Sequence, residues 1–423
     1  MNNLCTIFGQ TIEYNFLSSW IKYLRIKQDI SQEALAYGIC STSHLCYFEN
    51  GKRSLKEDII EALLKKLGIS KLDKNKNIGK IRQMFYSMIQ EIEYLNFDSA
   101  TNIYNELKEM EDFLNDSLYS FEFKIYKITY LFFVKKLTYD ELKEDIEILD
   151  KTLTFDDNNL KYTYLLTSGR CIYKHHSHDE GIERLLQAQK LIDTPWINYH
   201  LGFSYCFNNK PLKGTYYLSK ALESYEKSGK YLNAVLCHNT LSVCYSYLSM
   251  YDESLVHSEA ALNGAKFFDM DDVISSVYID LSDIFFNKKD YKKSIEYSIL
   301  AMDLCDNSLP EFSLLAACNY IDAIVAIGDL DLLKPIFHKY LNDNFKSSRY
   351  YKLLYYKYLK CYHFQEDIFY EEIINNILPF YKKINYIELY TEIELSLIKH
   401  LESKRKYKKA NLIYKDLLQN GMV

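Results

Sequence analysis

The segment at residues 31–54, SQEALAYGICSTSHLCYFENGKRS, contains side chains that could bind another molecule. Hydroxyl groups and a histidine gather near residue 42, and two adjacent cations, Lys52 and Arg53, follow ten residues later. Groups of these kinds hydrogen-bond to base edges and neutralise phosphates, so the segment could read DNA. It could also be an ordinary helical hairpin, and the elements around it must distinguish the two.

A second polar tract, Lys174-His175-His176-Ser177-His178, has the composition of a metal-binding segment. It falls between two predicted helices, and no cysteine or carboxylate set at metal-ligand spacing accompanies it, so we expect no metal site. The chain contains neither a GxxxxGK[ST] nor a GxGxxG motif, which argues against a nucleotide cradle. We therefore expect neither a cofactor nor an enzyme, although an enzyme hidden in the rest of the chain is a third possibility.

The composition favours a helical protein with a basic head. Hydrophobic residues make up 48% of the 423 residues, and only 5 Pro and 13 Gly are present, which favours long helices. Residues 1–75 carry 10 Lys and Arg against 8 Asp and Glu, whereas the remainder carries 41 against 49. This distribution permits nucleic-acid binding at the head only.

The N-terminal sequence lacks the pattern of a secretion signal. Residues 1–10 have no basic segment followed by an apolar one, and the chain has no run of 18 uncharged apolar residues. The ten cysteines form no CxxC pair, which is typical of reduced thiols. We expect a cytoplasmic protein that does not enter a membrane.

Four helices are predicted in the first 72 residues. Apolar residues recur every three or four positions from Phe16 to Leu24, and again in the segment 55–69. Two shorter helices lie between them, over 32–36 and from about 42 to 50. Their ends are predicted by N-cap candidates and by glycines that tolerate positive φ: Ser31, Ser41 or Thr42, Gly38 and Gly51.

Two short helices joined by a tight turn form a helix-turn-helix. The run resembles the Xre/Cro-type helix-turn-helix in Ser31-Gln32-Glu33-Ala34-Leu35-Ala36 and in Glu49-Asn50-Gly51-Lys52-Arg53. The spacing between these motifs, with Ile39-Cys40 inside it, resembles the PlcR-type branch of the RRNPP family of peptide-sensing regulators.

The resemblance implies a DNA-binding role for named residues. Gln32 would contact a phosphate. Base edges in the major groove would be reached from Ser41, Thr42, Ser43 and His44. The backbone or flanking bases would be contacted by Tyr47, Lys52 and Arg53. The family often has Ser-Arg where this chain has Cys46-Tyr47, so one basic contact is missing, and a fold kept only for protein contacts is the alternative.

The rest of the chain repeats with a period of about 40 residues. Leu201, Leu241 and Leu281 are spaced by 40, and each period fits a helix, a short turn and a second helix. Two further series keep the same spacing: Tyr205, Tyr245 and Phe285, and Ala221, Ala261 and Ala301. The units resemble tetratricopeptide repeats, with Leu201, Gly202 and Tyr205 matching the L-G-x-x-Y core.

The predicted fold class is all-α, with an N-terminal helix-turn-helix followed by a right-handed superhelical solenoid of tetratricopeptide-like repeats. We predict a helix-turn-helix domain at 1–72, a linker at 73–79 and a repeat domain at 80–423 for peptide binding and dimerisation. About nine units are expected to begin near residues 78, 119, 159, 196, 233, 272, 310, 348 and 386. Degenerate first and last units would cap the stack.

The repeat resemblance also implies a concave groove that suits an extended peptide. Positions two residues before and after the repeated leucine point inward in such repeats. An Asn there can bind a peptide backbone, and an Arg can pair with a carboxylate. This rule also selects Ile279, and the predicted peptide-binding residues are Arg170, Tyr199, Phe203, Asn239, Val243, Asp283, Asn319 and Asp322.

The two parts together resemble the RRNPP family over nearly the whole chain. The resemblance implies a transcriptional regulator controlled by a short signalling peptide. It also implies a homodimer on double-stranded DNA with a palindromic operator, because one helix-turn-helix buries little surface on DNA. The alternative is a Rap-like receptor, whose repeats sequester or modulate a partner such as a response regulator while the head makes protein contacts.

Overall fold

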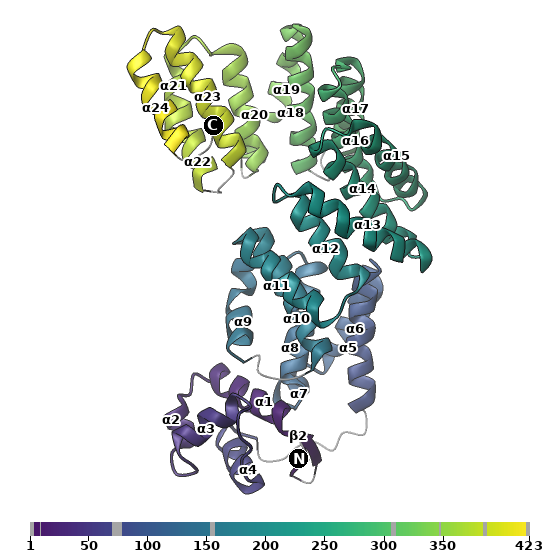
Figure 1. The fold of residues 1–423 in the computed structure, drawn as a ribbon, viewed down its shortest axis with the longest axis vertical. Helices are drawn as coiled ribbons and strands as arrows, with labels where there is room; N and C mark the ends of the chain where they lie inside the picture. Colours follow the sequence, from purple (N-terminus) through teal and green to yellow (C-terminus); the bar gives the residue numbers. More distant parts are fainter. Residues whose placement is uncertain are drawn as a thin grey trace. The chain divides into compact units, whose positions relative to one another are not determined.

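The computed structural model describes residues 4–8, 10–69, 78–152, 157–305, 310–346, 348–383 and 387–419. The chain divides into two compact units, Met1–Leu248 and Ser249–Val423, which are treated separately below. Helices dominate both units (Figure 1), so the all-α prediction is confirmed for all but one short element.

That element is an antiparallel hairpin of β1 (Leu4–Ile7) and β2 (Gln10–Glu13), which the sequence did not predict. Carboxylates on a helix about fifty residues away hold it in place. The backbone N–H of Thr6 donates to Glu57 Oε1 at 2.6 Å, and that of Phe8 donates to Glu61 Oε1 at 2.9 Å. Because these bonds are long-range, local sequence patterns do not reveal them.

Four helices form the head: α1 (Tyr14–Lys27), α2 (Gln32–Ala36), α3 (Thr42–Glu49) and α4 (Glu57–Lys66). The predicted caps are confirmed. Ser31 Oγ accepts the N–H of Ala34 at 3.0 Å, and Ser41 Oγ accepts that of His44 at 3.2 Å. Gly38 and Gly51 have φ of 78° and 66°, the left-handed region that glycine adopts without steric cost.

The repeats in the first unit run from α5 to α14. Their bounds are α5 (Ile78–Glu93), α6 (Phe97–Glu109), α7 (Glu111–Asp116), α8 (Ser120–Phe133), α9 (Tyr139–Thr152), α10 (Asn158–His175), α11 (His178–Leu191), α12 (Pro195–Cys206), α13 (Pro211–Lys227) and α14 (Tyr231–Tyr247). The short helix α7 is an insertion that the repeat period did not predict.

The second unit continues the helix pairs. Its elements are α15 (Tyr251–Phe267), α16 (Asp271–Asn287), α17 (Tyr291–Cys305), α18 (Pro310–Ile327), α19 (Leu333–Tyr340), α20 (Arg349–Tyr362), α21 (Asp367–Glu372), α22 (Leu378–Lys383), α23 (Ile387–Ser403) and α24 (Tyr407–Gln419). Single turns at Leu330–Leu332 and Asp343–Phe345 and a π-helical turn at Ile373–Ile377 interrupt the pattern.

The predicted unit starts agree with the observed helices. The first helix of each pair begins at Ile78, Ser120, Asn158, Pro195, Tyr231, Asp271, Pro310, Arg349 and Ile387, within two residues of each prediction. The last two residues of the predicted linker at 73–79, Ile78 and Gly79, lie in the first turn of α5. Residues 73–77 lie outside the described residues, so the remaining domain boundaries stay predictions.

The head packs directly on the first repeats. Trp20 of α1 is fully buried, and its indole Nε1 donates to Ser120 Oγ of α8 at 3.0 Å across 100 residues of sequence. The ring of Tyr23 meets that of Phe121 edge to face at 5.5 Å. One apolar core therefore spans the head and the first repeats.

Helix α18 needs a separate comment, because its length and apolar composition would also allow it to cross a membrane. No other helix in the described part of the chain meets that test. The helix packs against α16, α17 and α20, and its Asp322 forms an ion pair with Lys357. These contacts fit the core helix of a repeat.

The close contact between α12 and α13 depends on a small residue. A Cβ placed on Gly202 in α12 would lie 2.5 Å from Leu218 Cγ of α13. Gly202→Ala should therefore lower the free energy of unfolding by about 1–3 kcal/mol through overpacking. Urea unfolding followed by circular dichroism measures this change.

Gly79→Ala provides the matched control, since nothing lies within 4 Å of its added Cβ and alanine favours helix. It should leave the stability unchanged or raise it by up to about 1 kcal/mol. Equal destabilisation by both substitutions would contradict the packing assigned to Gly202.

Candidate functional site

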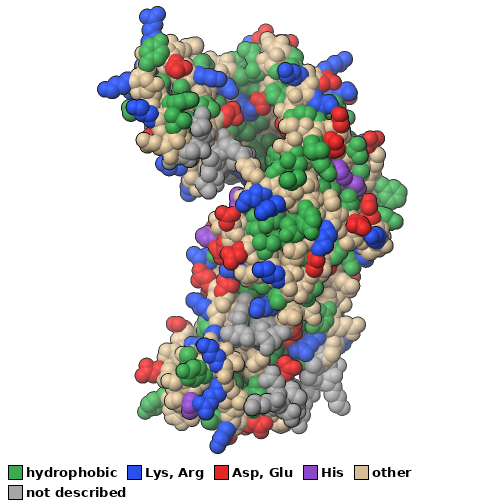
Figure 2. Space-filling model, in the orientation of Figure 1, with side chains coloured by type: hydrophobic (Ala, Val, Ile, Leu, Met, Phe, Trp, Pro, Cys, Tyr) green, Lys and Arg blue, Asp and Glu red, His purple; other side chains and the backbone are tan. Residues whose placement is uncertain are grey.

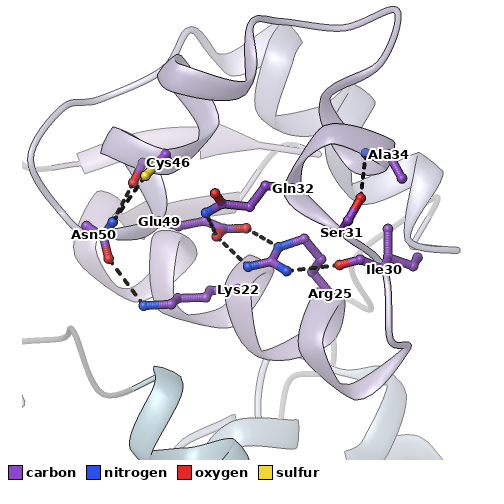
Figure 3. A network of polar contacts seen from close by, with 9 residues as sticks. All are labelled: Lys22, Arg25, Ile30, Ser31, Gln32, Ala34, Cys46, Glu49 and Asn50. Atoms are coloured by element: carbon purple, nitrogen blue, oxygen red, sulfur yellow. Dashed lines mark hydrogen bonds and ion pairs between the residues drawn. The ribbon is translucent and has the colours of Figure 1, made fainter.

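A buried carboxylate joins the three helices of the helix-turn-helix (Figure 3). Glu49, at the end of α3, has no exposed surface. Arg25 of α1 donates to it twice, from Nε at 2.6 Å and from Nη2 at 2.7 Å, and Gln32 Nε2 of α2 donates at 2.6 Å. Arg25 also donates from Nη1 to the carbonyl of Ile30 at 2.9 Å. The network fixes α1, α2 and α3 relative to one another.

This network gives Gln32 a structural task that the sequence did not predict. The side chain is half-buried and one of its amide N–H groups is used by Glu49. Its phosphate contact stays a prediction. Glu49 begins the Glu-Asn-Gly motif on which the family resemblance rests. The position of this motif in the sequence did not indicate that Arg25 would be the partner of Glu49.

Helix α3 has a buried face and an exposed face. Leu45 and Phe48 point into the head core and are essentially unexposed. The predicted base-reading side chains are all exposed, on α3 or at its start: Ser41, Thr42, Ser43, His44 and Tyr47. Because Ser41 uses its hydroxyl as the helix cap, Thr42, Ser43 and His44 are the better placed to reach a ligand.

Basic side chains flank this exposed face. Lys52 and Arg53 are exposed, and Arg53 Nη1 lies 3.5 Å from His44 Nε2. Figure 2 shows Lys and Arg side chains beside a histidine on the surface of the head. Hydroxyl and imidazole groups bordered by cations can hydrogen-bond to base edges while the cations neutralise phosphates.

In the first unit, the structure brings together several predicted peptide-binding residues. The guanidinium carbon of Arg170, on α10, lies 4.6 Å from the ring centre of Phe203 on α12. The ring of Phe203 lies 6.4 Å from that of Tyr199. Tyr199 and Val243 both pack against the small apolar cluster around Leu241. Asn239 lies half-buried on α14, one turn before Val243.

Arg170 carries a charge that no carboxylate in the described ranges neutralises. Its Nη1 donates to Ser204 Oγ at 3.3 Å, and its Nε is buried without a hydrogen-bond partner. No carboxylate among the described residues forms an ion pair with it. Burial lowers the pKa of Arg170, with partial compensation from Tyr199 and Tyr173. A ligand carboxylate would supply the missing partner.

Sequence reasoning missed His200, the neighbour of this group. His200 is 6% exposed, and neither ring nitrogen has a hydrogen-bond partner. Its ring lies among those of Phe133, Trp196 and Tyr199, at 5.2–5.7 Å between centres. Burial, and then the charge of Arg170, lower its pKa well below the ordinary value, so it is neutral. Only its position beside Tyr199 could have signalled it.

The second unit contains the other predicted residues. Asp283 is exposed on α16, and Asn319 Nδ2 of α18 donates to the carbonyl of Ile279 at 3.2 Å. Asp322 Oδ1 lies 2.5 Å from Lys357 Nζ of α20, a partner that the sequence did not predict. Asn319 therefore has one amide N–H occupied, and Asp322 is already paired.

The histidine tract is divided between two helices. His175 ends α10, while Ser177 caps α11 by accepting the N–H of Glu180 at 3.4 Å. The rings of His176 and His178 stack on Tyr139 and Tyr173, at 5.0 and 4.8 Å. Within the described ranges, no group of three His, Cys, Asp or Glu side chains could hold a metal ion.

Three comparisons with known proteins bear on this arrangement. A family model described as helix-turn-helix matches residues 21–73. The transcriptional activator NprA of Geobacillus stearothermophilus is 22% identical over 407 residues, which cover 90% of this chain and 97% of that protein.

Solved structures share the fold. The apo quorum sensor NprR from B. thuringiensis matches with a TM-score of 0.66 and 18% identity, over 81% of this chain and 98% of that one. A Rap protein complexed with competence and sporulation factor matches with a TM-score of 0.65 and 14% identity, over 81% and 97%. NprR in complex with its cognate peptide NprX matches with a TM-score of 0.63 and 17% identity, over 82% and 98%.

The buried network predicts a loss of stability that can be followed at the head. Glu49→Gln removes the charge that pairs with nearly buried Arg25, and should lower the free energy of unfolding by about 3 kcal/mol. Trp20 and Trp196 are the two tryptophans of the chain, so a Trp196→Phe background leaves Trp20 as the fluorescent reporter of the head.

Glu33→Gln, on the exposed side of α2, is the control and should change stability by less than about 1 kcal/mol. The role given to Glu49 would be refuted if both substitutions shifted the Trp20 transition equally.

Proposed function

We infer that this chain, a member of the RRNPP family, is a transcriptional regulator that binds DNA through its head and is controlled by a short peptide bound to its repeats. The helix-turn-helix match, the full-length relation to a transcriptional activator and the shared fold support this function. We propose a cytoplasmic, non-enzymatic protein, in keeping with relatives named as regulators and quorum sensors.

The observation that carries the DNA-binding role is the exposed face of α3. Glu49 holds the helix from behind, and Thr42, Ser43 and His44 face solvent at its N-terminal end. A recognition helix contacts base edges with its N-terminal residues, so this arrangement fits the major groove. Lys52 and Arg53 would contact the backbone on the same side.

The observation that supports peptide binding is the unneutralised Arg170 beside Phe203 and Tyr199. An extended peptide could place a carboxylate against the guanidinium and apolar side chains against the two rings. NprR has been solved in complex with its peptide, and we propose that the equivalent ligand class binds here.

We propose that the protein acts as a homodimer on a palindromic operator, because two half-sites are needed for useful affinity. The peptide would shift the equilibrium between two arrangements of the heads. The free energy of this shift cannot exceed the difference between the binding free energies of the peptide for the two arrangements. Since α1 packs on α8, we propose that the change reaches the head through this contact.

The alternative is a receptor that sequesters or modulates a partner protein. The fold match to a Rap protein favours this possibility. The head argues against it as the main role, because its exposed α3 face combines side chains that can bind base edges with cations that can bind phosphates.

The DNA-binding role predicts two kinds of mutant. Thr42→Ala with His44→Ala removes base contacts and should weaken binding to the DNA upstream of the gene by about tenfold or more. Lys52→Ala removes a phosphate contact, so it should weaken specific and non-specific binding alike and lower the salt slope by about one. Fluorescence anisotropy across a salt series measures both effects.

A double variant that stays folded and binds its upstream DNA as well as the native chain would exclude α3 as the reading helix. Weak, salt-sensitive and sequence-independent binding by the native protein would instead support the partner-binding alternative.

The peptide-binding role predicts a specific effect of Arg170→Gln. Loss of a charge-assisted hydrogen bond costs about 1.5–3 kcal/mol, so affinity for the cognate peptide should fall by about ten- to a hundredfold. Isothermal titration with the peptide encoded by a small neighbouring open reading frame measures this loss.

Lys227→Gln, an exposed cation on α13, removes the same charge from the same unit and should not change peptide affinity. Both variants should bind DNA like the native protein when no peptide is present. Unchanged peptide affinity in Arg170→Gln would remove this residue from the binding surface.

A further inference from the structure

A second binding feature lies in the second unit, and its interpretation rests on the proposed peptide-binding function. Three consecutive first helices, α16, α18 and α20, carry polar side chains at adjoining positions. We call this set the acidic stripe, and it consists of Asp280, Asp283, Asn319, Asp322 and Lys357.

Direct bonds hold the stripe together. Asn319 Nδ2 donates to the carbonyl of Ile279 at 3.2 Å and so joins α18 to α16. Asp322 pairs with Lys357 and so joins α18 to α20. Lys357 is nearly buried, with a side chain 12% exposed, so its ammonium is committed to Asp322. The stripe therefore contains three carboxylates and one cation, which is already used.

The two remaining carboxylates lie one helical turn apart on α16. Asp283 accepts from Asn287 Nδ2 at 3.2 Å and is exposed. Asp280 Oδ2 is buried from solvent and has no hydrogen-bond partner among the residues that the structure describes. A buried polar atom without a partner is destabilising, so the native fold retains an unfavourable group at this place.

The electrostatics of both carboxyls agree with this geometry. Burial, and then the neighbouring Asp283, raise the pKa of Asp280 to about 8. Although part of the Asp283 residue is exposed, desolvation of its carboxyl by the surrounding protein, and then the charge of Asp322, raise the pKa of Asp283. Each carboxyl therefore lacks a nearby positive charge that would favour its ionised form.

We propose that the acidic stripe binds a cationic group of the peptide ligand, an ammonium or a guanidinium, between Asp280 and Asp283. Such a group supplies the donor that Asp280 Oδ2 lacks and the positive charge that the two carboxyls lack. Charge-assisted hydrogen bonds of this kind are about twice as strong as neutral ones. The cation is either the side chain of a lysine or arginine or the N-terminal ammonium of the peptide.

The test uses the full-length protein and a synthetic pool of random heptapeptides, in one version with free and in another with acetylated N-termini. Protein-bound peptides are separated by size exclusion and identified by mass spectrometry.

The variants are Asp280→Asn and Asp283→Asn. Asp303→Asn, an exposed carboxylate on α17 of the same unit, is the control. Thermal unfolding by circular dichroism verifies that each variant is folded, and Asp283→Asn, being exposed, keeps the test valid if Asp280→Asn does not fold.

One expected result is at least a threefold enrichment of Lys and Arg at one position among the bound acetylated peptides. The other is that peptides with free N-termini are bound at least threefold more than peptides with acetylated N-termini. The first outcome identifies a side chain as the cation, and the second identifies the N-terminus. Either preference should disappear in Asp280→Asn or Asp283→Asn and persist in Asp303→Asn.

Bound peptides without a cationic preference, or with a preference that survives both stripe variants, would overturn the acidic-stripe proposal and leave the peptide receptor intact. Binding of no peptide above a protein-free control would overturn the proposed peptide-binding function and this inference with it.

Discussion

The position of the exposed α3 face depends on one buried charge. Glu49 is removed from water, and a carboxylate in that position must be paired. Arg25 and Gln32 supply the pairing from two other helices, so the charge fixes the positions of α1 and α2 as well as α3. With its core side held in this way, α3 can face solvent with small polar side chains that contribute little to stability. Selection can act on those side chains without disturbing the fold.

In the repeats, the apolar side chains are well packed, whereas some polar side chains lack hydrogen-bond or ion-pair partners. Repeated leucines and small residues fill the space between paired helices, and the polar residues next to them are left with incomplete partners. Arg170 lacks a carboxylate in the first unit, and Asp280 lacks a donor in the second. Both groups reduce stability in the free protein. Such incomplete pairing is what a receptor needs if its ligand is to complete it.

The sequence predicted what local chemistry determines. Helix starts followed from the 40-residue period, and the caps at Ser31 and Ser41 followed from single hydroxyls near free N–H groups. The anchoring of the hairpin on Glu57, the packing of Trp20 on Ser120 and the Asp322–Lys357 pair were not predicted, because each joins residues far apart in sequence. The roles of the predicted DNA-binding and peptide-binding residues remain predictions, and His200 and Asp280 emerged only from the burial that the tertiary fold imposes.

The contact between α1 and α8 has a consequence for how such proteins diversify. A genetic exchange that joined a foreign head at residue 72 would separate Trp20 and Tyr23 from the surface that covers them, and would expose Phe121 to water. Heads and repeats are therefore not freely interchangeable modules. If α3 reads DNA as proposed, new operator specificity would arise by substitution on α3, or by inheritance of a larger segment that carries α8 and α9 along with the head.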